Sequence, residues 1–214
     1  MSGFKARLGG ILKIDPRLMR RMRKIVAPFR RVGLKKEFTL LANNCWGGRL
    51  YDKFSLQYLS PTIGLSINAE EFVKFVENLD EYLQKELIPI EEGQKRVNSE
   101  WGFYPCMLDD IRIEFRHYRN VNDAITKWNR RKPRIKKENI IVKMSYYGTI
   151  NDAIIERFKK LPYKKILFSD NDELISLRNE DTKVIYIPKE SIGSEFVYSD
   201  SKLKLKELKK FINQ

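Results

Sequence analysis

The chain has 214 residues, of which 42% are hydrophobic and 12% aromatic, a composition that excludes a generally disordered protein. Its two cysteines are too few for a disulfide-stapled secreted scaffold, and no run approaches the ~18 apolar residues that a membrane span needs. The net charge is +14 and no secretory signal opens the chain, so we expect a soluble cytoplasmic protein.

The positive charge is concentrated at one end of the chain. Residues 1–36 contain twelve Lys or Arg and a single acid, Asp15, whereas the remaining residues are nearly balanced. A balanced body gives no reason to expect a groove for a polyanion there. We therefore expect a basic tail at residues 1–36 and one α/β domain at residues 37–214.

Within the tail, Asp15-Pro16 is a good helix start, and apolar residues recur at helical spacing from Leu18 to Phe29. Basic residues occupy the other face, which predicts a short basic amphipathic helix that ends near Pro28. Three interpretations stay open. The apolar stripe packs on its own domain, it lies on an anionic membrane surface as a peripheral anchor, or the helix binds nucleic acid. The last is disfavoured, because no zinc-finger, RNA-binding or helix-turn-helix pattern accompanies the charge.

Strands and helices alternate after the tail. The patterns predict strands at residues 38–42, 61–67, 111–117, 140–144, 165–168 and 184–187. They predict helices at residues 49–56, 68–84, 122–131, 149–161 and 203–212. Residues 91–105 are polar and predict a loop. This rhythm favours a layered, largely parallel sheet, with one antiparallel strand near Ile111.

The strongest candidate site is the segment that follows the first strand: Asn43, Asn44, Cys45, Trp46, Gly47 and Gly48. In open α/β sheets, ligands bind beyond the carboxyl ends of the strands. The two amides can donate and accept hydrogen bonds, the indole offers a flat face to a sugar or a base, and the glycines permit positive φ and close approach. Cys45 at a helix start is a candidate nucleophile. A tight turn with a buried cysteine and a packing indole is the structural alternative.

Two further places hold candidate catalytic groups. The neighbouring carboxylates Asp109 and Asp110 precede the alternating strand and could act as acid and base, although a structural turn is the alternative. His117, the one histidine of the chain, should share a face with Ile111, Ile113 and Phe115. A single histidine excludes a histidine-based metal site, and no metal or cofactor is predicted.

A dense positive cluster, residues 128–134, ends the predicted helix before Pro133. Such a cluster suits the negative end of the helix dipole without any ligand. Binding of a phosphate or an anionic sugar is the alternative, with Arg131 as the candidate residue.

Several uncommon short motifs occur one after another along the sequence. They are Asn43–Gly48, Ser60-Pro61-Thr62, Tyr104-Pro105, Leu108–Ile111, Phe115–Tyr118 and Lys127–Arg131. From about Phe38 to about Asp172, the chain resembles a bacterial family of unknown function that is associated with exopolysaccharide biosynthesis. The resemblance implies a Rossmann-like layered α/β fold with helices on both faces of the sheet, and a place in capsule or exopolysaccharide assembly.

Two hypotheses follow. In the first, the chain is a transferase that acts on a sugar or nucleotide sugar, with Asn43, Asn44 and Trp46 holding the substrate. Asp109, Asp110 or His117 would then be the acid or base. In the second, it is a non-catalytic assembly partner, with the same loop as a binding surface and the basic helix as its docking element.

Overall fold

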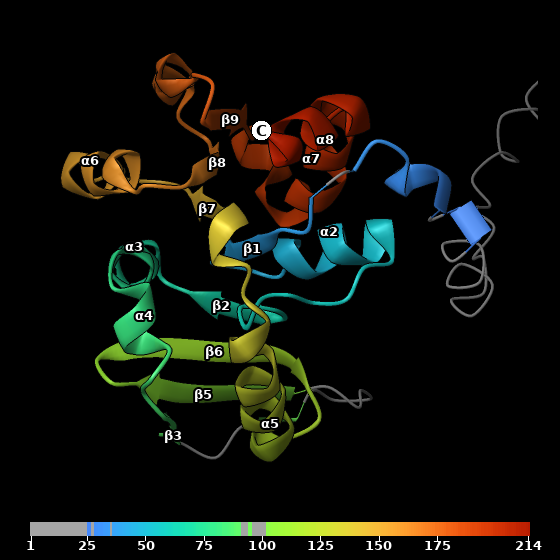
Figure 1. Cartoon of the computed structure of the whole chain (residues 1–214). Helices are drawn as coiled ribbons and strands as arrows, with labels where there is room; N and C mark the ends of the chain where they lie inside the picture. The colour runs from blue at the N-terminus through green and yellow to red at the C-terminus, as the bar shows by residue number, and fades with distance from the viewer. Residues whose placement is uncertain (1–24, 27, 35, 91–93, 96–101) are drawn as a thin grey trace, which may run out of the picture.

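The computed structural model describes residues 25–26, 28–34, 36–90, 94–95 and 102–214. The fold is mixed α/β and contains a parallel and an antiparallel sheet (Figure 1). The helices are α2 (Trp46–Phe54), α3 (Ala69–Glu77), α4 (Leu79–Tyr82), α5 (Val121–Arg131), α6 (Asp152–Lys160), α7 (Glu195–Lys202) and α8 (Leu205–Asn213). Short 3₁₀ helices cover Lys132–Arg134, Lys137–Asn139, Asp172–Leu177 and Lys189–Ser194.

The parallel sheet has four strands within the described residues. In spatial order they are β1 (Thr39–Ala42), β7 (Ile140–Tyr146), β8 (Lys164–Ser169) and β9 (Thr182–Tyr186). Their apolar side chains are buried on both faces, which explains why these segments read as continuous hydrophobic runs. All four carboxyl ends lie at one edge of the sheet, where a ligand site is expected.

Helices cover both faces of the parallel sheet. Alternation of side chains along β1 sends Leu40 toward one hydrophobic core and Leu41 toward the other. The Leu40 core is closed by α2 and α8, and the Leu41 core by α3 and α6. Figure 1 shows α2, α7 and α8 on one side of the strands, with α3 and α6 on the other. The predicted α/β class, with a parallel sheet between helices, is therefore confirmed.

The antiparallel sheet is formed by the part of the chain that lies between β1 and β7 in the sequence. Its strands run in the order β2 (Leu65–Ile67), β6 (Ile111–Tyr118), β5 (Gly102–Leu108) and β3 (Leu87–Pro89), and β4 (Gln94–Lys95) also pairs with β5. Helix α5 packs on it through Trp128, which is completely buried beside Phe75 and Phe115. The two sheets meet where the Ile67 N–H donates to the Asn43 carbonyl at 2.9 Å.

Three predicted elements need correction. The segment near Ile111 does not join the parallel sheet as an antiparallel strand, because it pairs within the separate sheet. The predicted loop at residues 91–105 contains β4 and the first part of β5, whose strand pattern is obscured by Pro105 and the polar residues around it. The long helix predicted at residues 68–84 breaks at Asn78, where φ is −116° and ψ is 38°.

Most of the predicted basic amphipathic helix lies outside the described residues. Residues 25, 26 and 28–31 are helical, so helical structure is present beyond Pro28, where the sequence predicted an end. Among the described residues, no helix has the length and apolar character that crossing a membrane requires.

Candidate functional site

The carboxyl edge of the parallel sheet holds a cluster of polar side chains. Asn43 and Asn44 directly follow β1, Ser145 lies near the end of the neighbouring strand β7, and Tyr147 follows that strand. Glu195, the first residue of α7, reaches the same place from far along the chain. We refer to these five residues together with Lys143 as the strand-edge cluster. It occupies the position that open α/β sheets use for ligands.

Asn43 ties the strand ends together. Its Nδ2 donates to the Ser145 carbonyl at 2.9 Å, and its Oδ1 accepts from the Ser145 N–H at 2.8 Å. Its own carbonyl accepts from the Ile67 N–H of the second sheet. Because the side chain is buried and every one of these polar atoms is paired, Asn43 positions the site from beneath.

Lys143 lies at the centre of the cluster and is completely buried. Its Nζ donates to Asn44 Oδ1 at 2.9 Å and to Ser145 Oγ, and it lies 4.4 Å from the centre of the Phe168 ring. Burial lowers the pKa of the ammonium to about 7, and the negative charge of the nearby Glu195 carboxylate opposes this shift. A lysine with such a pKa can give or take a proton near neutral pH.

Glu195 supplies the carboxylate of the cluster. Its Oε1 accepts from Asn44 Nδ2 at 2.7 Å, and its Oε2 accepts from Ser145 Oγ at 3.2 Å and from the Tyr147 hydroxyl. Burial, reinforced by the hydrogen bond to Glu195, raises the pKa of the Tyr147 hydroxyl well above its ordinary value. Tyr147 therefore stays a neutral donor. Ser145 Oγ accepts from Lys143 Nζ and donates to Glu195 Oε2, so hydrogen bonds connect the lysine to the carboxylate through the serine.

Sequence reasoning missed Lys143 and Glu195. Lys143 lies inside the run Ile140 to Met144, whose pattern predicts a buried strand, although a lysine is almost never fully buried without a partner. A lysine inside this apolar run is therefore the sequence signal that points to a polar site there. Glu195 follows the segment that carries the motifs, and nothing in its local pattern marks it.

Trp46, Gly47 and Gly48 have different roles from those expected. The Trp46 indole is 2% exposed, packs edge-on against Phe168 and donates from Nε1 to Ser199 at 3.1 Å, so its face is not open to a sugar. Both glycines lie in right-handed helix α2 and do not supply positive φ. They do permit close approach: a Cβ at Gly47 would lie 3.1 Å from Ala42 Cβ, so α2 packs tightly on β1.

Cys45 occupies the N-cap position of α2 and is half-buried. Its thiol does not cap the helix. Asn44 Oδ1 does so instead, accepting from the Trp46 N–H at 3.1 Å. Cys45 Sγ lies 3.7 Å from the Leu65 carbonyl, and the thiol is close enough to Lys143 to act on it electrostatically, which places it beside the strand-edge cluster.

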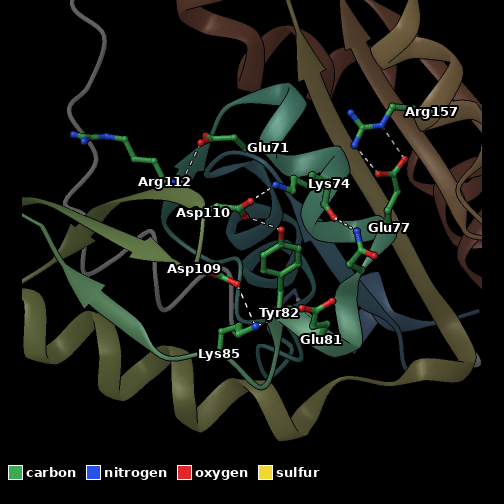
Figure 2. Close-up of polar contacts among 11 residues, drawn as sticks. Glu71, Lys74, Glu77, Glu81, Tyr82, Lys85, Asp109, Asp110, Arg112 and Arg157 are labelled. Atoms are coloured by element: carbon green, nitrogen blue, oxygen red, sulfur yellow. Dashed lines mark hydrogen bonds and ion pairs between the residues drawn. The ribbon is translucent and has the colours of Figure 1, made fainter.

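Asp109 and Asp110 lie elsewhere, in the β5–β6 turn shown in Figure 2. Asp109, with φ of 58°, pairs with Lys85 at 3.2 Å. Asp110 pairs with Lys74 and accepts from the Tyr82 hydroxyl at 2.8 Å, and these hydrogen bonds lower its pKa. Both carboxylates are about half exposed, and their partners come from α3, α4 and the following turn. This arrangement fastens the hairpin to the helices.

His117 lies at the opposite end of β6. Six residues separate it from Ile111, which at about 3.3 Å per residue is about 20 Å of strand. The Arg116 and His117 N–H groups both donate to the Gly64 carbonyl, so the strand bulges and alternation is lost. His117 is therefore exposed and Tyr118 is buried, which corrects the predicted face. Asp109, Asp110 and His117 do not form one site with each other.

Arg131 is also placed away from solvent. It is 5% exposed at the end of α5, donates from Nη1 to the Tyr118 hydroxyl at 2.9 Å and lies over the Tyr58 ring at 5.0 Å. These contacts fasten α5 to β6. The guanidinium faces packed side chains rather than an open anion site.

Comparison with known proteins identifies a family and a relative. Residues 18–201 match the family model described as "Domain of unknown function (DUF1919)". A protein of Haemophilus influenzae described as "Uncharacterized protein" is 27% identical over 132 residues, which cover 61% of this chain and 61% of that protein. The chain therefore spans less than two thirds of the length of this relative.

Proposed function

This chain belongs to the family described as Domain of unknown function (DUF1919), and we propose that it is an enzyme of cell-surface polysaccharide assembly that transfers a sugar or sugar-derived group. The pathway rests on the resemblance of its motif words to a family associated with exopolysaccharide synthesis. The chemistry rests on the strand-edge cluster, in which Lys143 and Glu195 hold and move the proton.

The observation that carries the proposal is a buried lysine of near-neutral pKa at the carboxyl end of a parallel strand. Transfer to a hydroxyl acceptor requires removal of the acceptor proton, and a group with a pKa of about 7 is well matched to that task at neutral pH. Ser145 Oγ contacts Lys143 Nζ and lies 3.2 Å from Glu195 Oε2, so the proton has a defined route to the carboxylate.

The half-buried side chains around Lys143 are chemically suited to a polyhydroxylated ligand. Asn44, Cys45, Ser145 and Tyr147 are half-buried, and they lie around the fully buried Lys143. An amide and two hydroxyls can both donate and accept, as sugar hydroxyls do. In this proposal a substrate hydroxyl takes over one contact that Asn44 or Ser145 now makes with Lys143.

A non-catalytic binding function is the second candidate. Glu195 already accepts hydrogen bonds from three side chains, and Lys143 already has two oxygen partners. A network satisfied in this way also serves to close α7 onto the sheet. In that case Asn44 and its half-buried neighbours would bind a polysaccharide-assembly partner without turnover.

Thermal denaturation with nucleotide sugars, with and without magnesium or manganese, tests the proposal. A ligand at about 100 times its Kd stabilises by about 2.7 kcal/mol, which raises the Tm of a chain of this size by about 5–10 °C. We expect this rise for at least one nucleotide sugar, and we expect Ser145→Ala and Asn44→Ala to abolish it. Asp110→Asn, at the exposed β5–β6 turn, is the matched control and should keep it.

The outcome separates the two candidates. Release of the nucleotide in wild type and its loss in Lys143→Met, with the Tm shift retained, supports the enzyme. A Tm shift without any turnover supports the binding function. If no nucleotide sugar raises the Tm, or if Ser145→Ala responds as wild type does, the sugar site is not in the strand-edge cluster.

A further inference from the structure

Three large apolar side chains are exposed on the described part of the N-terminal helical segment. Ile25 is 68% exposed, Phe29 76% and Val32 69%. Their spacing of four and three residues places them on one face of a helix. We call this the Ile25–Phe29–Val32 face. It does not pack on the domain, and it is larger than the scattered single apolar residues that ordinary surfaces carry.

Arginines hold the segment against the end of α2. Arg30 Nη1 donates to the Lys53 carbonyl at 3.3 Å, and Arg31 Nε donates to the Phe54 carbonyl at 2.6 Å. These carbonyls belong to the last turn of α2, where cations are favoured. The segment, blue in Figure 1, is thus attached to the body through its arginines. Its apolar face is left toward solvent.

The surroundings of this face are positively charged. Lys209 Nζ donates to the Val32 carbonyl at 2.6 Å, which brings α8 beside the segment. Residues 202–210 hold five lysines and one acid, Glu207, and Arg30 and Arg31 lie on the segment itself. An exposed apolar face bordered by lysine and arginine has the two components that bind an anionic lipid surface.

We infer that the Ile25–Phe29–Val32 face docks this protein on an anionic membrane surface. The three side chains enter the boundary between headgroups and acyl chains, and the lysines of α8 contact the lipid phosphates. A second copy of the chain fits poorly, because self-association through this face would bring two positive surfaces together. Nucleic acid would use the charge and leave the three apolar side chains without a role.

Co-sedimentation of the full chain with vesicles tests this inference. We expect binding to vesicles of phosphatidylglycerol mixed with phosphatidylcholine, and much weaker binding to phosphatidylcholine alone. The variant Ile25→Ser/Phe29→Ser/Val32→Ser should lose at least about tenfold in partition coefficient, since three apolar groups no longer enter the bilayer. The matched control, Ile88→Ser/Val197→Ser, removes apolar side chains that are 60% and 68% exposed elsewhere and should bind as wild type does.

The folded state is checked by the Tm, which should not change because all the substituted side chains are exposed. Lys206→Ala/Lys210→Ala should weaken binding to the anionic vesicles, and added salt should weaken it further. Unchanged binding by the triple-serine variant overturns the inference. The inference is also overturned if the wild type is a dimer and the triple-serine variant is a monomer. It is overturned equally if the wild type binds RNA but not vesicles and the variant no longer binds RNA.

Discussion

The side chain of Asn43 pairs with the backbone of Ser145 through two hydrogen bonds, at 2.9 and 2.8 Å, and thereby continues the β1–β7 pairing beyond the end of β1. Asn43 therefore has a structural role. It fixes the strand ends on which Asn44, Lys143 and Ser145 are mounted, so the geometry of the strand-edge cluster depends on it.

Replacing this residue should therefore be costly. Asn43→Ala leaves the Ser145 N–H and carbonyl without these partners in a buried place, so we expect a loss of about 2–4 kcal/mol in the free energy of unfolding. Urea denaturation measures it. Asn122→Ala, at an exposed position of α5, is the control and should change stability by less than about 0.5 kcal/mol. Equal stability of both variants would show that the pairing contributes nothing.

The two cysteines should differ in reactivity. Cys106 is 0% exposed in β5, and burial raises its pKa to about 11, whereas Cys45 is half-buried beside the strand-edge cluster. Because the thiolate is the reactive form, we expect iodoacetamide to label Cys45 at least about tenfold faster than Cys106 near neutral pH. Peptide mapping after timed labelling measures both rates. Similar labelling rates for the two cysteines, or labelling of both only after unfolding, would show that the Cys45 thiol is not accessible as its half-buried position implies.

Lys143 should make stability depend on pH. Burial lowers its folded-state pKa from the ordinary value of 10.5 to about 7, so between these values the unfolded chain holds more protons than the folded chain. The free energy of unfolding then rises with pH across this window. Lys143→Met removes the effect. We expect the stability of wild type relative to the variant to increase by about 3 kcal/mol between about pH 7 and pH 9.5.

Urea denaturation of both proteins at matched pH values measures this difference. Lys209→Met, which replaces a half-exposed lysine of α8, is the control and should follow the wild-type curve. Parallel curves for wild type and Lys143→Met would show that the buried ammonium is not perturbed.

The layered α/β architecture could be predicted because its signals are local. Apolar runs mark β1, β7 and β8, and Asn68 begins α3 by accepting from the Glu70 N–H, as expected for a capping residue. The division into two sheets could not be predicted, since strand pairing joins residues far apart in the chain. Pro105 inside β5 hid a strand that pairs on both sides.

The sequence predicted which strand end carries Asn43 and Asn44, but not which other side chains lie beside them. A strand that ends in Asn43-Asn44 marks the carboxyl edge of the sheet, and both amides do lie in the cluster. Glu195 could not be found, because it is 151 residues from Asn44 and arrives there only through the packing of α7. The predicted face of His117 was wrong because a bulge at Arg116 and His117, opposite Gly64, interrupts the alternation of β6.

The measurement that tests the central claim most directly is an NMR titration of Lys143, in protein labelled at the lysine ε carbons and assigned by comparison with Lys143→Met. We expect a midpoint near pH 7, because the ammonium is desolvated. Glu195→Gln should lower the midpoint further, because the carboxylate charge favours the protonated form. A midpoint above about pH 10, as in an ordinary lysine, or no response to Glu195→Gln would contradict a proton-transfer role for this pair.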